Sequence, residues 1–285
     1  MTESQSYTLP SVPVDVSELR DPGERSAGRV MWIFAVPVII AVGFYSLVTF
    51  GILPLFVFLF GRIGQLFVLA HFKMNGVRVS SEQFPVLNHA ADNFAQRLGI
   101  QRPDVYIVQE TVFNAFAARL AGTHVVVLFS GAVDSILRSG DEDDLAFILG
   151  HEFGHIAAGH LTFMHYLQAL GGWFIWVGLW YRRRMEMTCD RIGLALVGDR
   201  DRAMRAMSHM MVGSELASEI NYGAAFAQLR EHQGEFFVKY RNIYSFYPSL
   251  LSRLEHLDSC EGVLPARSAP GASLLPPPLP EASAG

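Results

Sequence analysis

The sequence has few charged residues, almost no cysteine and none of the common nucleotide-binding or serine-hydrolase motifs. Charged residues make up 17% of its 285 residues, whereas an average soluble domain has roughly 25%. The two cysteines, Cys189 and Cys260, are too few for a disulfide framework. The chain contains no P-loop, no G-x-S-x-G motif, no Rossmann fingerprint and no internal repeat. Because the net charge is −5 and no basic stripe is present, we expect no nucleic-acid partner.

In place of these features the sequence has a long apolar run near its beginning. Residues 30–60 contain no charged residue, and the apolar character resumes after Arg62. A straight helix over this run would be about 46 Å long, whereas the hydrocarbon core of a bilayer is about 30 Å thick. We therefore predict a membrane anchor over residues 30–78, in the form of a helical hairpin that breaks near Gly51 and Pro54. One long, steeply tilted helix is the alternative.

Polar segments lie at both ends of the chain. Residues 1–29 contain three prolines and show no periodicity, so they are predicted to be a disordered arm. Residues 261–285 are rich in proline, alanine and serine and are predicted to be a disordered tail. Between the anchor and this tail, residues 79–260 contain helical and strand patterns and are predicted to fold as one domain. Basic residues flank both ends of the apolar run, which suits a hairpin with both ends in the cytoplasm.

Residues 150–160 read GHEFGHIAAGH, inside a predicted helix over residues 141–160. On a helix, His151 and His155 lie one turn apart, so their imidazoles project from the same face. That separation suits two nitrogens of one tetrahedral zinc ion. Glu152 lies beside them, where it can hold and deprotonate the water that zinc activates. The motif therefore predicts a catalytic zinc site.

Two histidines need a further protein ligand. The H-E-x-x-H-x-x-G-x-x-H arrangement needs a histidine where this chain has Leu161, and His160 would point away from the ligand face. Glu186 and Asp190 are also one helical turn apart, and we expect Glu186 to bind zinc while Asp190 orients a ligand histidine. A solvated charged helix is the alternative for this pair. Cys189 is a rival soft ligand, which we interpret as a small core residue.

A second apolar stretch, residues 161–181, separates the two halves of this predicted site. A single membrane span would put Glu186 and His155 on opposite sides of the bilayer, and the stretch is too short for two spans. We therefore expect it to fold back near Gly171 and Gly172, either packed on the core or dipping into the membrane interface.

HEFGHIAAGH, followed by an apolar stretch and EMTCDRIGLAL, resembles the HtpX-like membrane zinc metallopeptidases, in a clan that also contains the prenyl-protein (CAAX) endopeptidases. The resemblance extends over residues 84–257, from FPVL to YPSLLSRLEHL. It implies an α+β, mainly helical zincin-type domain with a small β-sheet beside the HExxH helix, following the membrane hairpin. It also implies one zinc ion per chain, held by His151, His155 and Glu186, with Glu152 as the base that hydrolyses peptide bonds.

The resemblance also assigns residues to the substrate cleft. Asn114, Ala115 and Phe116 match the segment that lines the cleft, and an edge strand there could bind peptides by β-augmentation. In the family a histidine precedes a proline near the C-terminal motif, and this chain has Tyr247 instead. Its phenol could stabilise the oxyanion without a positive charge; packing on the core is the alternative. Arg253 matches the arginine of the same motif and is expected to contact substrate.

Taken together, these features predict a membrane-anchored zinc endopeptidase for unfolded or membrane-associated polypeptides, as in protein quality control. Its catalytic domain is expected on the cytoplasmic side, at the inner membrane if the chain is bacterial. A narrow-specificity processing peptidase is one alternative, although prenyl-protein enzymes need more membrane helices than this chain supplies. A non-catalytic, zinc-stabilised membrane adaptor or chaperone is another, but such a site has no use for Glu152 as a base. The sequence does not indicate an oligomeric state.

Overall fold

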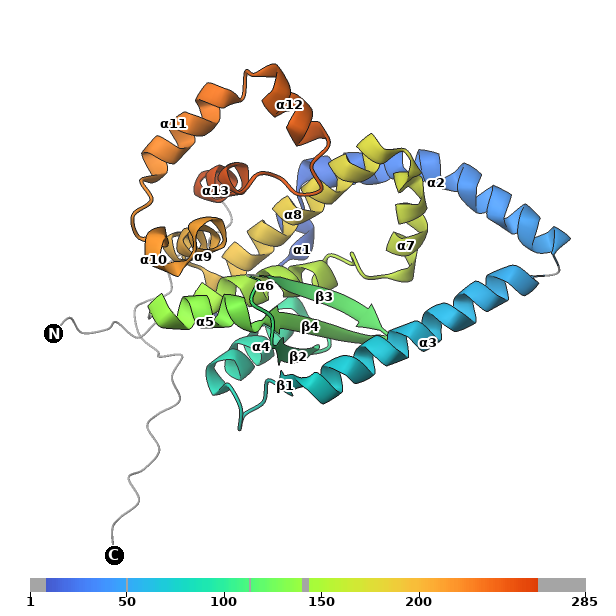
Figure 1. The fold of residues 1–285 in the computed structure, drawn as a ribbon, viewed down its shortest axis with the longest axis horizontal. Helices are drawn as coiled ribbons and strands as arrows, with labels where there is room; N and C mark the ends of the chain where they lie inside the picture. Colours follow the sequence, from blue (N-terminus) through green and yellow to red (C-terminus); the bar gives the residue numbers. More distant parts are fainter. Residues whose placement is uncertain (1–8, 50, 113, 140–143, 261–285) are drawn as a thin grey trace, which may run out of the picture.

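Helices make up most of the chain, and a four-stranded sheet lies beside them (Figure 1). The computed structural model describes residues 9–49, 51–112, 114–139 and 144–260. Its elements are α1 (Val16–Leu19), α2 (Pro22–Val48), α3 (Ile52–Asn75), β1 (Gly76–Arg78), α4 (Pro85–Leu98), β2 (Asp104–Val108), β3 (Ala115–Leu120), β4 (Thr123–Phe129), α5 (Ser130–Ser139), α6 (Asp144–Ala157), α7 (Phe163–Ala169), η1 (Leu170–Trp173), α8 (Ile175–Val197), α9 (Arg200–Val212), α10 (Ser214–Ala217), α11 (Tyr222–His232), α12 (Phe236–Ile243) and α13 (Leu250–Ser259). The predicted α+β, mainly helical fold is confirmed.

The apolar run forms two helices, α2 and α3, which meet at an apex at the right of Figure 1 and diverge from it. Gly51 caps the start of α3 with a left-handed backbone, φ 72°, a conformation that glycine adopts without steric cost. The predicted break near Gly51 is therefore confirmed, and the alternative of one continuous helix is wrong. Both helices are long and apolar enough to cross a membrane, and most of their side chains are exposed.

The prediction that residues 1–29 are a disordered arm is wrong for its second half, because α1 and the start of α2 lie there. The side chain of Asp21 accepts a hydrogen bond from the Gly23 N–H, and Pro22 occupies the first helical position. Both features favour the start of a helix. Ala27 is buried against residues of α8 and anchors this first part of α2 to the domain. Residues 1–8 and the predicted tail, 261–285, lie outside the described residues.

The sheet has the strand order β1-β2-β4-β3, so β3 lies at one edge. Strands β2 and β4 are parallel, whereas β1 and β3 pair antiparallel with their neighbours. The Phe129 N–H donates to the Asn114 carbonyl at 3.0 Å, which makes these two residues a hydrogen-bonded pair. Because such pairs alternate along an antiparallel ladder, the backbone groups of Ala115 and Ala117 face away from β4, toward the free edge.

Helices α6 and α8 pack closely side by side because glycines line their contact. A Cβ atom on Gly193 would lie 3.2 Å from the His151 nitrogen, and one on Gly154 would lie 3.2 Å from the Cys189 Cα. Larger residues would push the helices apart. The contacts pair early residues of α6 with late residues of α8, so the helices are antiparallel. This packing sets the HExxH turn of α6 against Glu186.

The second apolar stretch folds back through α7 and the turn at residues 170–174, as its length and glycines predict. The Trp173 indole N–H donates to the Phe34 carbonyl at 3.1 Å, and the rings of Phe34 and Phe174 stack at 4.7 Å. The turn therefore packs on α2. It leaves Glu186 on the same side of the molecule as the HExxH histidines.

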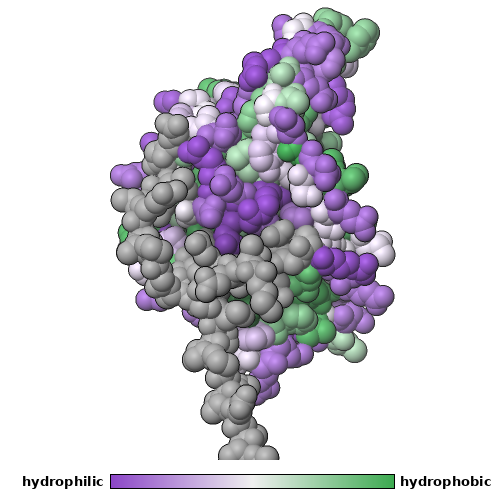
Figure 2. All heavy atoms as spheres, turned by 90° about the vertical axis from the view of Figure 1, so that its left-hand side faces the viewer, coloured by the Kyte–Doolittle hydropathy of each residue, from purple (hydrophilic) through white to green (hydrophobic). Residues whose placement is uncertain are grey.

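The surface has contrasting ends. Figure 2 views the molecule from the left-hand side of Figure 1, away from the apex of α2 and α3, and the visible surface there is mostly hydrophilic, with a hydrophobic area in its lower part. The exposed side chains of α2 and α3, in contrast, are mainly large hydrophobic residues. A polar end opposite an apolar hairpin is the arrangement expected of a domain anchored to a bilayer.

Candidate active site and metal centre

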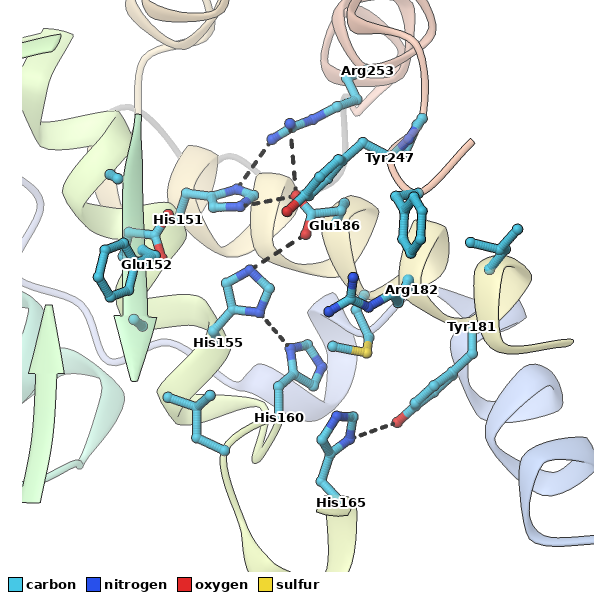
Figure 3. Close-up of a pocket in the computed structure, with 18 of the residues that line it drawn as sticks. His151, Glu152, His155, His160, His165, Tyr181, Arg182, Glu186, Tyr247 and Arg253 are labelled. Atoms are coloured by element: carbon cyan, nitrogen blue, oxygen red, sulfur yellow. Dashed lines mark hydrogen bonds and ion pairs between the residues drawn. The ribbon is translucent and has the colours of Figure 1, made fainter. Parts of the chain in front are cut away.

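Two imidazoles and one carboxylate converge between α6 and α8 (Figure 3). The His151 Nε2 atom lies 3.3 Å from one Glu186 oxygen, and the His155 Nε2 atom lies 3.6 Å from the other. All three side chains are mostly buried. The structure thus brings together the three residues that the sequence singles out as metal ligands.

The spacing of these donor atoms fits a zinc ion. Ligand atoms bonded to tetrahedral zinc at about 2.1 Å lie roughly 3.4 Å from one another, and each imidazole Nε2 atom lies at a similar distance, 3.3 or 3.6 Å, from its own Glu186 oxygen. Burial lowers the pKa of His155 to about 3, so its imidazole is neutral and has a lone pair to donate. Burial also acts to lower the pKa of His151, but hydrogen bonds to Asp190 and Glu186 raise it to about 10. A metal would therefore displace a proton from His151.

Cys189 lies close enough to compete with Glu186 as a ligand, because its sulfur is within 4.8 Å of donor nitrogens of His151 and His155. The sulfur also contacts the Nδ1 atom of His160 at 3.7 Å. Burial raises the pKa of the Cys189 thiol well above its usual value, so a metal bound through its sulfur would have to displace a tightly held proton. Glu186, in contrast, places an oxygen near each Nε2 atom. We therefore favour Glu186.

The buried ion pair of Asp190 and Arg253 contacts the Nδ1 atom of His151. Asp190 accepts from the His151 Nδ1 atom at 2.9 Å, which is the contact expected of a residue that orients a ligand. Arg253 donates to both oxygens of Asp190, at 2.8 and 2.6 Å, and lies 3.7 Å from Glu186. The guanidinium is buried with them. Its predicted contact with substrate stays a prediction, because the contacts observed here are with Asp190, His151 and Glu186.

Glu152 lines the same cleft as the two histidines. It is buried, and burial raises the pKa of its carboxyl to about 7. The backbone N–H of Ala117, on the edge strand β3, donates to this carboxylate. A carboxylate whose pKa lies near the working pH suits proton transfer.

His160 takes a position that the sequence does not predict. Helix α6 ends at Ala157 rather than continuing to residue 160, and Gly159 turns the chain with a φ of 79°. Only glycine adopts this left-handed conformation without strain. The turn brings the His160 Nδ1 atom to 3.0 Å from the His155 Nδ1 atom. The prediction that His160 points away from the site is therefore wrong.

A cleft of about 1010 Å³ opens over this centre. It is lined by the proposed ligands and Glu152, and also by the residues that the family resemblance implies for it, Asn114, Ala115, Phe116 and Tyr247. In Figure 3 the ring of Tyr247 is directed toward the side of the cleft where Glu186 and His151 stand. Met31 of α2 and Ile175 of α8 form part of the wall, so the cleft reaches the base of the membrane hairpin.

Comparisons with known proteins find sequence similarity to metallopeptidases. The model of "Peptidase family M48" matches residues 81–177, which include the HExxH helix. A plastoglobule-localized metallopeptidase 48 of Arabidopsis thaliana is 27% identical over 172 residues, covering 55% of this chain and 49% of the relative. An HtpX protease homolog of Methanothermobacter thermautotrophicus is 32% identical over 128 residues, which cover 45% of this chain and 46% of the relative. An HtpX protease homolog of Trichormus variabilis is 25% identical over 231 residues, which cover 66% of this chain and 78% of the relative.

The matched region therefore spans about half the length of the first two relatives. No solved structure matches the chain. The family match rests on the segment from α4 to the start of α8, and the longer alignment to the Trichormus homolog extends it. On these matches and the observed fold, the chain is similar to the HtpX-like members of peptidase family M48.

Proposed function

We propose that the protein is a zinc-dependent endopeptidase, anchored in a membrane by α2 and α3, that hydrolyses unfolded or membrane-associated polypeptides. The observation that carries the proposal is the convergence of His151, His155 and Glu186, with each imidazole Nε2 atom 3.3 or 3.6 Å from a Glu186 oxygen, beside the buried carboxylate of Glu152. A site built only to stabilise the fold would be closed by four protein ligands. Three ligands facing a cleft leave one position for chemistry.

In this proposal the two histidines and Glu186 hold one zinc ion per chain. When bound, zinc supplies Lewis acidity that makes water a nucleophile near neutral pH and polarises a carbonyl group. Glu152 accepts the proton of the attacking water and then delivers it to the leaving amine nitrogen. The N–H of Ala117 holds the Glu152 carboxylate in place for both transfers.

Strand β3 supplies the substrate-binding edge. The backbone carbonyl groups of Ala115 and Ala117 face the cleft side of this edge strand, while their N–H groups donate to the Asn114 side chain and to Glu152. A substrate in extended conformation would add as a further strand through main-chain hydrogen bonds, which read little side-chain identity. This mode of binding suits unfolded polypeptides of varied sequence.

Tyr247 is proposed to donate a hydrogen bond to the oxyanion. It lines the cleft and its side chain is exposed rather than packed in the core, which favours this role over the alternative of core packing. A neutral phenol can stabilise developing negative charge when it is correctly placed. The activity of Tyr247→Phe tests this role, since phenylalanine keeps the ring and removes the donor.

A hairpin that crosses a bilayer twice would have the start of α2 and the end of α3 on the same side. Arginine and lysine residues flank both of these ends, including Arg29 and Lys73. By the positive-inside rule this side is cytoplasmic. We therefore place the catalytic domain in the cytoplasm.

Casein cleavage by detergent-purified protein tests the proposed function. Casein is unfolded, so it can add to β3 without prior unfolding. We expect cleavage by the zinc-loaded protein, loss of cleavage after chelation and recovery when zinc is returned. Cleavage that survives complete removal of zinc would contradict the proposal.

A further inference from the structure

The Nδ1 atom of His155 is held by a chain of contacts that begins on the membrane hairpin. His155 Nδ1 lies 3.0 Å from His160 Nδ1, and His160 Nε2 lies 3.3 Å from an oxygen of Glu24. Glu24 belongs to the first turn of α2. Its side chain and that of His160 are each 2% exposed, so water does not substitute for these contacts.

The geometry permits one consistent assignment of protons. If His155 Nε2 offers its lone pair to a metal, the ring proton of a neutral His155 is on Nδ1, facing His160. His160 must then accept at Nδ1 and carry its own proton on Nε2. That Nε2–H points at the Glu24 carboxylate, which accepts it. The Cys189 thiol also reaches His160 Nδ1, but at the longer distance of 3.7 Å.

Other residues hold Glu24 for this role. Thr188 of α8 donates its hydroxyl to one Glu24 oxygen, and Arg20 pairs with the other. The Arg20 guanidinium also donates to the Ala158 carbonyl at 2.6 Å, just before the turn that carries His160. The carboxylate is thus fixed from both α8 and the end of α6.

We propose that His160 and Glu24 are positioning residues for the metal ligand His155. Asp190 does the same for His151 by direct contact at 2.9 Å. Each ligand histidine is therefore oriented by a carboxylate, and for His155 that carboxylate, Glu24, acts through His160. Since Glu24 lies at the base of α2, the membrane anchor takes part in building the metal site. This inference rests on the proposed function, because it requires His155 to bind zinc.

Zinc affinity measured by chelator competition on the full-length, detergent-purified chain tests the inference. The variants are His160→Gln, Glu24→Gln and the double substitution. Loss of a residue that orients a ligand histidine typically weakens metal binding about 10–100-fold, and we expect this for each single variant. Because both residues act in one chain of contacts, the double variant should lose little more than the weaker-binding single variant. His209→Gln is the matched control, a buried histidine that contacts Asp144 at 3.6 Å, and it should keep the wild-type affinity.

A spectroscopic readout separates positioning from general destabilisation. At saturating Co²⁺, the visible absorption of the two single variants should differ from that of the wild type, because the imidazole of His155 is no longer held in one orientation. The His209→Gln spectrum should match the wild type. If His160→Gln does not fold, Glu24→Gln, which keeps the size of the side chain, carries the test.

The outcomes separate a failure of the inference about His160 and Glu24 from a failure of the proposed function. Wild-type zinc affinity and an unchanged Co²⁺ spectrum in the folded variants would overturn the inference and leave the proposed function intact. Failure of the wild type itself to bind zinc tightly would overturn the proposed function, and the inference with it. Weakened binding in Glu24→Gln and His160→Gln, with non-additive losses, supports the inference.

Discussion

Replacing Glu152 with glutamine is expected to lower kcat/KM for casein by about 10²–10⁴-fold, the range typical for loss of a general acid–base group. Glutamine has nearly the same shape and can still accept the hydrogen bond from the Ala117 N–H, but it cannot take a proton from water. The proposed zinc ligands are His151, His155 and Glu186. Glu152 is not among them, so the zinc content should be unchanged. The measurement is cleavage rate alongside the metal content of the same sample.

Glu215→Gln serves as the control, since it makes the same chemical change at an exposed site in α10. It should retain wild-type activity. Equal activity of Glu152→Gln and the wild type would rule out Glu152 as the base. If zinc is lost from Glu152→Gln, the residue contributes to metal binding and the proposed division of roles is wrong.

Replacing Arg253 with methionine is expected to be the most destabilising single substitution in the site. Arg253 pairs with both oxygens of the fully buried Asp190. Removing one partner of a buried ion pair typically costs about 3–5 kcal/mol, because the remaining charge is left without compensation. In a chain of this size we expect Tm to fall by about 10 °C, together with weaker zinc binding because Asp190 no longer orients His151.

Thermal melting of the detergent-purified, metal-free protein measures this effect. Arg230→Met is the control, because Arg230 makes an exposed pair with Glu255 at 3.3 Å, and exposed pairs contribute roughly 0–1 kcal/mol. Arg253→Lys should fall between the two, since an ammonium group cannot make the same two-pronged contact. Equal melting temperatures for Arg253→Met and Arg230→Met would contradict the assigned role of the ion pair.

Local sequence patterns were sufficient to predict most of the site. The spacing of His151 and His155, and of Glu186 and Asp190, depends only on helical periodicity, which the sequence carries directly. The length of residues 161–181 was also enough to require a fold-back between the two helices. The juxtaposition of these side chains is predictable because it depends on residues within one or two helical turns, or on chain length, whereas their roles stay predictions.

The rest of the site depends on contacts between distant segments. Glu24 and His160 are 136 residues apart in sequence, and no periodicity connects them. Gly159 ends α6 early, but a glycine inside an apolar helical pattern does not by itself indicate a stop. The ordered start of α2 is likewise not predicted: Asp21 and Pro22 are local helix-start signals, but the packing of Ala27 against α8 depends on residues far along the chain.

The zinc content of the purified chain tests the central claim most directly, measured by elemental analysis on the wild type, Glu186→Ala and Cys189→Ala. We predict close to one zinc per chain in the wild type and in Cys189→Ala, and a large loss in Glu186→Ala. Retention of zinc by Glu186→Ala together with its loss from Cys189→Ala would show that the sulfur is the third ligand. Absence of zinc from the wild type after loading would contradict the assignment of this site as a zinc centre.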